Sequence, residues 1–132
     1  QAAMLLAAFE NFPAEIKQRQ EIGARYDALL SEANLADVQL PQIANASTSV
    51  YAQYTILSPE RDALQAKLKT AGIPAVTYYA KPLHLQPVFE KLEYHSGDFP
   101  VTESTAAQCL SLPMSAYLTA EDQQRVVDAI KA

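Results

Sequence analysis

The side chains best suited to chemistry lie close together between residues 78 and 87, in the segment Tyr-Tyr-Ala-Lys-Pro-Leu-His-Leu-Gln-Pro. This segment combines the titratable imidazole of His84 with the Lys81 amine, the Gln86 amide and two phenols. Its two prolines restrict the backbone, and a stiff loop that displays polar groups suits a binding surface. Two interpretations stay open: a ligand-binding segment, or a surface loop in which His84 binds a backbone carbonyl.

The remaining reactive side chains do not form a catalytic set. His95 lies in a polar, turn-like stretch, which favours a solvated loop histidine. Cys109 follows an alanine-rich segment, which favours a buried structural thiol rather than a thiolate partner for His84. Two histidines and scattered carboxylates show no metal-ligand spacing, and no GxSxG nucleophile motif is present. We therefore predict no catalytic residue and no metal site, and nothing supports an independent hydrolase or metalloenzyme.

The lysines are poor candidates for a Schiff base. A lysine that forms an imine must be desolvated or lie beside another cation, so that it is a free amine near pH 7. Lys81 alone has aromatic, partly apolar neighbours, but it precedes a proline in a loop. The others fall on polar helix faces, in a charged loop or at the terminus: Lys17, Lys67, Lys69, Lys91 and Lys131. We expect none of them to bind a cofactor as an imine.

Length and composition exclude several classes of protein. A chain of 132 residues corresponds to one domain, and a single cysteine excludes an internal disulfide framework. The net charge of −5 argues against a general nucleic-acid or anionic-membrane binder. Three isolated glycines cannot build a dinucleotide fingerprint or a P-loop. The longest apolar run is far too short to span a membrane and no signal peptide is visible, so we predict a cytoplasmic protein.

The chain opens on an apolar, alanine-rich segment, Gln1–Phe9, with no initiator methionine and no N-cap before it. A natural chain rarely starts inside a helix, because the first turn would leave apolar surface and N–H donors exposed. Trimming, or numbering from a mature product, would explain this start. A larger protein upstream would explain it too, and we favour that interpretation.

Helices are predicted from periodicity, caps and stops. A helix from Asn11-Phe12-Pro13 to about Ala33 buries one face, since Asn11 is a good N-cap and Pro13 suits a first turn. Further helices are predicted from Ser58-Pro59 to the Gly72 stop, over Pro100–Cys109, and after a capping box at Thr119. The buried positions that we expect are Phe12, Ile16, Ile22, Tyr26, Leu29, Leu30, Leu64, Leu68, Val126, Val127 and Ile130.

Strands are predicted at Val50–Leu57, Pro74–Tyr79 and Leu110–Pro113, with a brief one possible at Val38–Leu40. Their order suggests a split βαβ arrangement, in which 110–113 lies antiparallel between two parallel strands and the helices cover one face. The predicted fold class is therefore α/β (α+β), with long N-terminal helices and a small mixed or antiparallel sheet.

Gln53 is a polar residue within the first of these strands. By alternation it shares a face with Tyr51 and Thr55, opposite Tyr54 and Ile56. Either this face is simply more hydrated, or Gln53 and Tyr51 face a cleft or another domain.

Four stretches of the chain resemble the DegT/StrS-type sugar-nucleotide aminotransferases. They are the opening Gln-Ala-Ala-Met-Leu-Leu, the strand Ser49–Ile56, the motif from Gly72-Ile-Pro through Tyr78-Tyr79 to Pro82-Leu-His-Leu-Gln-Pro87, and the ending from Phe99-Pro-Val-Thr-Glu103 through Leu110-Ser-Leu-Pro-Met114. Together they span almost the whole chain. The sequence of the strand Ser49–Ile56 most resembles that of the branch that aminates a UDP-linked 3-ketoglucuronic acid derivative.

The resemblance implies the small domain of a fold-type I, pyridoxal-phosphate (PLP) enzyme, with residues 1–132 forming that single domain. It implies transfer of an amino group from glutamate to a keto nucleotide sugar for cell-surface polysaccharides. It places the catalytic lysine and the PLP-binding groups in a large domain upstream, so this chain alone is expected to be inactive and to bind no cofactor. It also places His84, Tyr79, Gln86 and Gln53 at the substrate side of the cleft. No arginine that would hold a sugar carboxylate is identifiable, and Arg61, which opens a helix, is expected to be a solvated surface charge.

The resemblance implies a dimer with active sites at the subunit boundary. We expect self-association through the apolar N-terminal helix, because an isolated small domain would expose the surface that normally meets the large domain. One alternative stays open: a stand-alone, non-catalytic ligand-binding or interaction module of the same ancestry.

Overall fold

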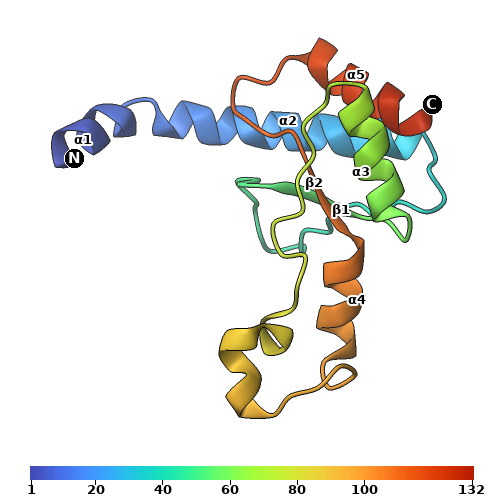
Figure 1. The fold of residues 1–132 in the computed structure, drawn as a ribbon. Helices are drawn as coiled ribbons and strands as arrows, with labels where there is room; N and C mark the ends of the chain where they lie inside the picture. Colours follow the sequence, from blue (N-terminus) through green and yellow to red (C-terminus); the bar gives the residue numbers. More distant parts are fainter.

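The computed structural model describes residues 1–132 and combines five α-helices, two 3-10 helices and two strands. Figure 1 shows a compact body, a long helical arm on one side and a smaller lobe on another. In chain order the elements are α1 (Ala2–Phe9), α2 (Phe12–Glu32), β1 (Tyr54–Leu57), α3 (Arg61–Thr70), η1 (Leu83–Leu85), η2 (Pro87–Leu92), α4 (Pro100–Gln108), β2 (Cys109–Leu112) and α5 (Ala120–Lys131). None of these helices combines the length and the apolar character that a membrane-spanning helix needs.

The sheet has the predicted strand order but shorter strands. β1 and β2 pair antiparallel, from Tyr54 opposite Leu112 to Leu57 opposite Cys109. Single bridges extend the sheet at both edges, Gln39 to Leu57 and Val76 to Ser111. The segment around Val76 is thus antiparallel to β2 and parallel to β1, as expected. The strands predicted at 38–40 and 74–79 are reduced to these bridges.

The predicted strand at 50–57 starts only at Tyr54. The alternation that placed Tyr51 on the same face as Gln53 therefore does not apply to Tyr51. Tyr51 has a φ of 44°, a left-handed conformation that a strand cannot contain. Its ring therefore leaves the face of Gln53 and stacks on Tyr54, with ring centroids 5.7 Å apart. Gly23 of α2 leaves the space for this ring, because a Cβ at that position would overlap it. The face that alternation predicted for Tyr51 and Gln53 together is therefore not formed, and Gln53 lines a pocket that Tyr51 does not reach.

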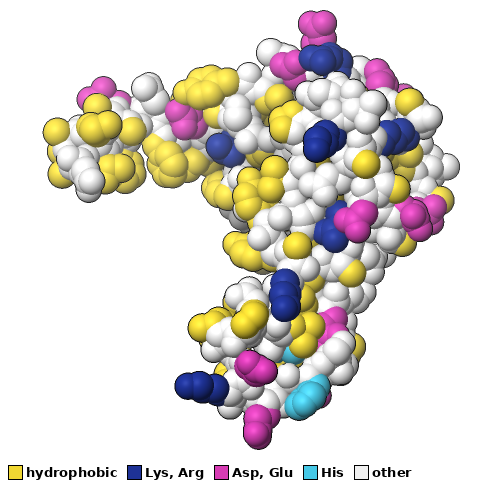
Figure 2. All heavy atoms as spheres, viewed as in Figure 1, with side chains coloured by type: hydrophobic (Ala, Val, Ile, Leu, Met, Phe, Trp, Pro, Cys, Tyr) yellow, Lys and Arg dark blue, Asp and Glu magenta, His cyan; other side chains and the backbone are white.

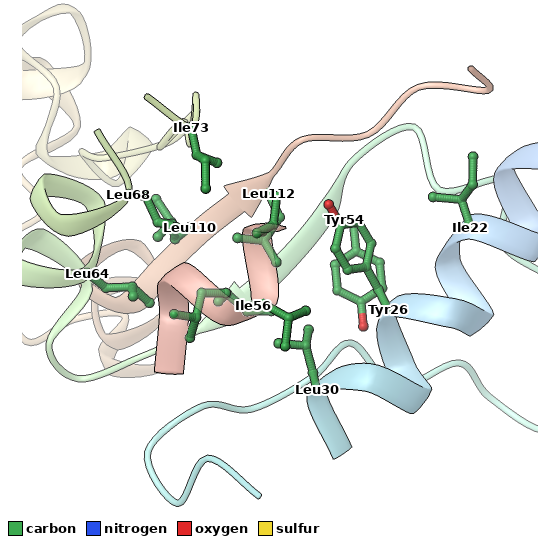
Figure 3. Close-up of a cluster of buried hydrophobic side chains, with 13 residues drawn as sticks. Ile22, Tyr26, Leu30, Tyr54, Ile56, Leu64, Leu68, Ile73, Leu110 and Leu112 are labelled. Atoms are coloured by element: carbon green, nitrogen blue, oxygen red, sulfur yellow. The ribbon is translucent and has the colours of Figure 1, made fainter. Parts of the chain in front are cut away.

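The core lies between one face of the sheet and three helices. Tyr54, Ile56, Leu110 and Leu112 point from the strands toward α2, α3 and α5 (Figure 3). The helices contribute Ile22, Tyr26, Leu30, Leu64, Leu68, Val126, Val127 and Ile130. The expectation of helices on one face holds for α2, α3 and α5, whereas α4 lies on the other side of the sheet. Most of the predicted inward positions are buried. Phe12 is an exception, because it lies on the projecting arm and is 49% exposed.

Hydrogen bonds and local signals fix the ends of these helices. Thr119 accepts a bond from the Asp122 N–H at the start of α5, as the capping box predicts. Gly72 has a φ of 72° just after α3, which is the expected left-handed stop. α3 itself begins at Arg61, two residues later than Pro59 suggested. Helices α2, α3 and α5 all pack on the core face of the sheet, so its second face stays free of them.

Two parts project from this body (Figure 1). α1 extends beyond the start of α2 and has no buried residue. Figure 2 shows hydrophobic side chains gathered over this arm. The lobe contains η1, η2 and α4, and it approaches the sheet from the side opposite the core.

Candidate functional site

A pocket of about 470 Å³ lies between the open face of the sheet and the lobe. Thr55 and Ser111 form its floor, and their hydroxyl oxygens are 2.8 Å apart. One wall is the segment from Tyr78 to Gln86, and the other is α4. The full lining is Gln53, Thr55, Tyr78, Tyr79, Lys81, Pro82, Leu83, Gln86, Val101, Thr102, Thr105, Ala106, Cys109 and Ser111.

Three of the four residues predicted at the substrate side line this one pocket. Gln53 precedes β1, whereas Tyr79 and Gln86 come from the opposite wall, so residues far apart in the sequence meet here. The Tyr79 side chain is largely exposed at the mouth. Gln86 donates only a long bond of 3.5 Å to the Lys81 carbonyl, which leaves its amide available to a ligand. Their contact with substrate stays a prediction.

His84, the fourth predicted residue, lies behind the wall and is absent from the lining. Its side chain is only 7% exposed, and Nε2 is 3.1 Å from Oε1 of Glu103. The imidazole also packs on Phe99, with centroids 4.8 Å apart. This geometry favours an indirect role for His84. Its direct contact with a substrate stays a prediction.

Glu103 is a central residue that the sequence analysis did not single out. Its carboxylate accepts bonds from the Gly97 N–H at 2.8 and 3.1 Å and from the Ser96 hydroxyl at 2.8 Å, besides that of His84. These donors, the Gly97 N–H first, hold the pKa of the Glu103 carboxyl below its usual value. The sequence did contain a signal for this role: Glu103 lies in the first turn of the helix that begins at Phe99-Pro100, and carboxylates at that position bind the free backbone N–H groups.

The lowered pKa of Glu103 predicts an acid-sensitive turn. A carboxylate with a depressed folded pKa stabilises the fold above its unfolded pKa, and the effect is lost as pH falls through the folded value. We expect the Gly97 amide resonance to shift and its hydrogen exchange to accelerate only once the pH has fallen below the ordinary pKa of a glutamate carboxyl. An NMR titration will measure this, with Glu103→Gln as the variant that lacks the transition. A Glu103 carboxyl that titrates at or above its ordinary value would contradict the prediction.

Arg61 corrects another expectation. The sequence suggested a solvated surface charge at the start of a helix, but the side chain is only 12% exposed. Its Nη1 donates to Thr77 Oγ1 at 3.0 Å and to the Cys109 carbonyl at 3.3 Å. The solvated-charge prediction is wrong because the fold brings these two acceptors to the helix start. Arg61 thereby links the start of α3 by a hydrogen bond to β2, a strand that contributes to the pocket floor.

The other two candidate groups behave as predicted. Cys109 is a buried free thiol, and it lines the pocket where α4 meets β2. His95 is exposed, and it bonds to Asp98 through its backbone alone: its N–H donates to the Asp98 carboxylate and its carbonyl accepts from the Asp98 N–H. No three His, Cys, Asp or Glu side chains come together in a way that could hold a metal ion.

The pocket does not fit PLP on its own. No carboxylate lines it, so a pyridine nitrogen would lack the acidic partner that PLP enzymes provide. Lys81 is the only lining amine, and it is exposed on a loop rather than desolvated. Lys67, by contrast, is engaged with the Ile130 carbonyl at the end of α5. What the pocket can do is bind an amphipathic ligand through amides, hydroxyls, phenols and one cation.

Comparison with known proteins gives a consistent result. Residues 1–131 match the model of the DegT/DnrJ/EryC1/StrS aminotransferase family. The chain is 45% identical to the pleiotropic regulatory protein of Geobacillus stearothermophilus, over 98% of this chain and 35% of that one. It is 40% identical to the UDP-2-acetamido-2-deoxy-3-oxo-D-glucuronate aminotransferase of Pseudomonas aeruginosa, over 89% of this chain and 31% of that one.

A solved structure agrees in fold. DesV from S. venezuelae, crystallised in complex with a ketimine intermediate, superimposes with a TM-score of 0.94 at 32% identity, over 99% of this chain and 35% of that one. The chain spans about a third of the length of the relatives that it matches. The fold is that of part of a fold-type I sugar aminotransferase. This protein belongs to the DegT/DnrJ/EryC1/StrS aminotransferase family.

Proposed function

We propose that this chain is the small domain of a PLP-dependent aminotransferase that transfers an amino group from glutamate to a keto nucleotide sugar. The observation that carries the proposal is the match along nearly the whole chain to relatives named as sugar-nucleotide aminotransferases, the Pseudomonas enzyme among them. The pocket supports the same assignment, because its amides, hydroxyls, phenols and lysine are groups that can recognise a sugar nucleotide. The product is an amino sugar for cell-surface polysaccharides, made in the cytoplasm.

The pocket residues suggest a division of roles. Gln53 and Gln86 offer amides that can both donate to and accept from sugar hydroxyls and an acetamido group. The Tyr79 phenol lies at the mouth, where an aromatic ring can stack on a base or sugar. Lys81 supplies the positive charge that a diphosphate or a carboxylate requires. The PLP-binding lysine and its acidic partner come from the rest of the parent enzyme.

A chimera tests this function. In the Pseudomonas relative, the matching region is replaced by this chain, and transamination is assayed with glutamate and UDP-2-acetamido-3-keto-glucuronate. We expect turnover by the chimera and none by this chain alone, even with added PLP. A folded chimera that carries PLP but does not aminate a nucleotide sugar would overturn the proposal. The matched variant Gln53→Leu in the chimera should raise KM for the sugar nucleotide.

A second candidate is a non-catalytic ligand-binding or interaction module of the same ancestry. One observation favours it: the relative from Geobacillus carries the name of a regulatory protein. The same chimera separates the two candidates, because a module that only binds its ligand would not restore turnover. Binding of a nucleotide sugar without turnover in the chimera would support this alternative.

The exposed arm supports a proposal for assembly. Met4, Leu5, Leu6 and Phe9 of α1 are between 60% and 76% exposed, and such a dense apolar surface is typical of an interface. We expect the chain to self-associate through α1, with the dimer partner or the large domain covering this face in the parent enzyme. Sedimentation equilibrium should show a dimer that Leu6→Glu converts to a monomer. The matched change Val88→Glu, at an equally exposed site on η2, should leave it intact; a wild-type monomer at high concentration would contradict the proposal.

A further inference from the structure

The two walls of the pocket are separate segments that contact the body independently. One wall runs from Tyr78 to Gln86 and the other is α4. Between residues 78–92 and α4 there is one hydrogen bond, from His84 Nε2 to Glu103 Oε1. The other hydrogen bonds of the segment 78–92 are local, such as Gln86 to the Lys81 carbonyl, whereas α4 is also joined to the body where its Gln108 carbonyl accepts from the Ser58 N–H at 3.0 Å. Near Thr77 the walls are joined through the Cys109 carbonyl, which accepts from Thr77 Oγ1 at 3.4 Å. Farther out, the His84–Glu103 bond and the packing of His84 on Phe99 join them, and this bond is the polar contact between the two walls.

Glu103 is a fixed acceptor rather than a mobile surface carboxylate. The Gly97 N–H and the Ser96 hydroxyl bind both of its oxygens, and the turn that contains them leads directly into α4. Its side chain is 20% exposed. An acceptor held by several donors keeps its position, so a bond from His84 transmits that position to the opposite wall.

His84 is placed to pass this constraint to groups that line the pocket. It is the middle residue of η1, and its neighbour Leu83 and the cap residue Gln86 both line the pocket. The imidazole is also fixed from the side by Phe99, whose ring packs edge-on against Tyr94 at 5.1 Å. Any shift of His84 away from Glu103 would move the Gln86 amide and widen the pocket.

We propose that His84 and Glu103 are positioning residues: their hydrogen bond sets the width of the pocket and holds Gln86 in place for the ligand. The proposal deepens the proposed function and rests on it for the identity of the ligand. Neither residue touches the substrate in this arrangement. His84 acts through the wall that it anchors, and Glu103 acts through His84.

The single cysteine provides a reporter of pocket width that needs no ligand. Cys109 lines the pocket and is only 9% exposed, so we expect its reaction with iodoacetamide to become faster when the walls part. Loss of a hydrogen bond to a charged group corresponds to about a tenfold change in such an opening equilibrium. His84→Leu should therefore raise the modification rate about tenfold.

Two substitutions of different side-chain length at position 84 distinguish a positioning hydrogen bond from simple packing. His84→Gln carries an amide that extends to Glu103, and we expect a modification rate within about twofold of the original. His84→Asn carries the same amide one methylene shorter, and it should behave like His84→Leu. His95→Leu, at the exposed histidine of the same lobe, is the matched control and should change nothing. Circular dichroism melting will verify that each variant is folded at the assay temperature.

Ligand binding provides the second readout. In NMR titrations with UDP-N-acetylglucosamine as the probe, His84→Leu and His84→Asn should bind several-fold more weakly, whereas His84→Gln should match the original chain. Equal thiol reactivity in His84→Leu and the original chain, or equal behaviour of the Gln and Asn variants, would overturn the proposal. If the original chain shows no shift with the probe, the proposed function fails, and the thiol series still decides whether the pair sets the pocket width.

Discussion

Replacement of Leu110 by alanine will lower the free energy of unfolding by about 2–5 kcal/mol. Leu110 is fully buried in β2, opposite Ile56 of β1 and within the cluster that joins the sheet to the helices. The loss combines the transfer free energy of the deleted carbons with the cost of the cavity left behind. Urea denaturation followed by circular dichroism will measure it, and the slope of the transition should stay unchanged.

The same change at Leu92 is the control. Leu92 is 59% exposed at the end of η2, so its truncation should alter the free energy of unfolding by no more than about 0.5 kcal/mol. Equal denaturation midpoints for the two variants would show that β2 does not carry the core.

Replacement of Arg61 by methionine has the second largest expected effect, a loss of about 1–3 kcal/mol in the free energy of unfolding. Methionine keeps much of the apolar stem but removes the donors to Thr77 and to the Cys109 carbonyl. These acceptors are partly buried, so water replaces the lost partners poorly. The Arg61–Asp62 pair contributes little, because Asp62 is 87% exposed.

Arg125 offers a matched control for Arg61. Its guanidinium is 3.5 Å from Asp122 on the surface of α5, and its side chain is 64% exposed. Arg125→Met should therefore change the free energy of unfolding by less than about 0.5 kcal/mol. Thermal unfolding of both variants will give the comparison. A loss at Arg125 as large as that at Arg61 would mean that charge, rather than the buried donors, controls stability.

Much of this fold follows from short-range signals in the sequence. Gly72 ends α3 and Thr119 begins α5 because glycine tolerates a positive φ and a threonine hydroxyl accepts a free N–H. The order of the strands could also be predicted from the sequence, since residues 110–113 could pair with the strand at 50–57 on one side and with the strand at 74–79 on the other. The length of the first strand could not be predicted in this way. Tyr51 and its neighbours have high β propensity, which favours a longer strand, but the Tyr51 ring packs in the space beside Gly23 and its backbone takes a positive φ.

The site was predictable only in part, for a physical reason. Gln53, Tyr79 and Gln86 were singled out by residue type and by the resemblance, and the fold brings them to one pocket. Arg61 and Glu103 were misjudged or overlooked because their partners are distant in sequence. The acceptors of Arg61 lie 16 and 48 residues away, and His84 lies 19 residues before Glu103. Local patterns cannot reveal such pairs.

The contact between α2 and α5 also constrains how this chain is made. Gln123 of α5 is fully buried and donates to the Ile22 carbonyl of α2, a partner 101 residues earlier in the chain. At the usual speed of translation, α2 emerges from the ribosome about 5–20 seconds before α5. During that interval the face of α2 that packs on α5 has no native partner. The nascent chain is therefore expected to depend on chaperone protection until α5 has emerged.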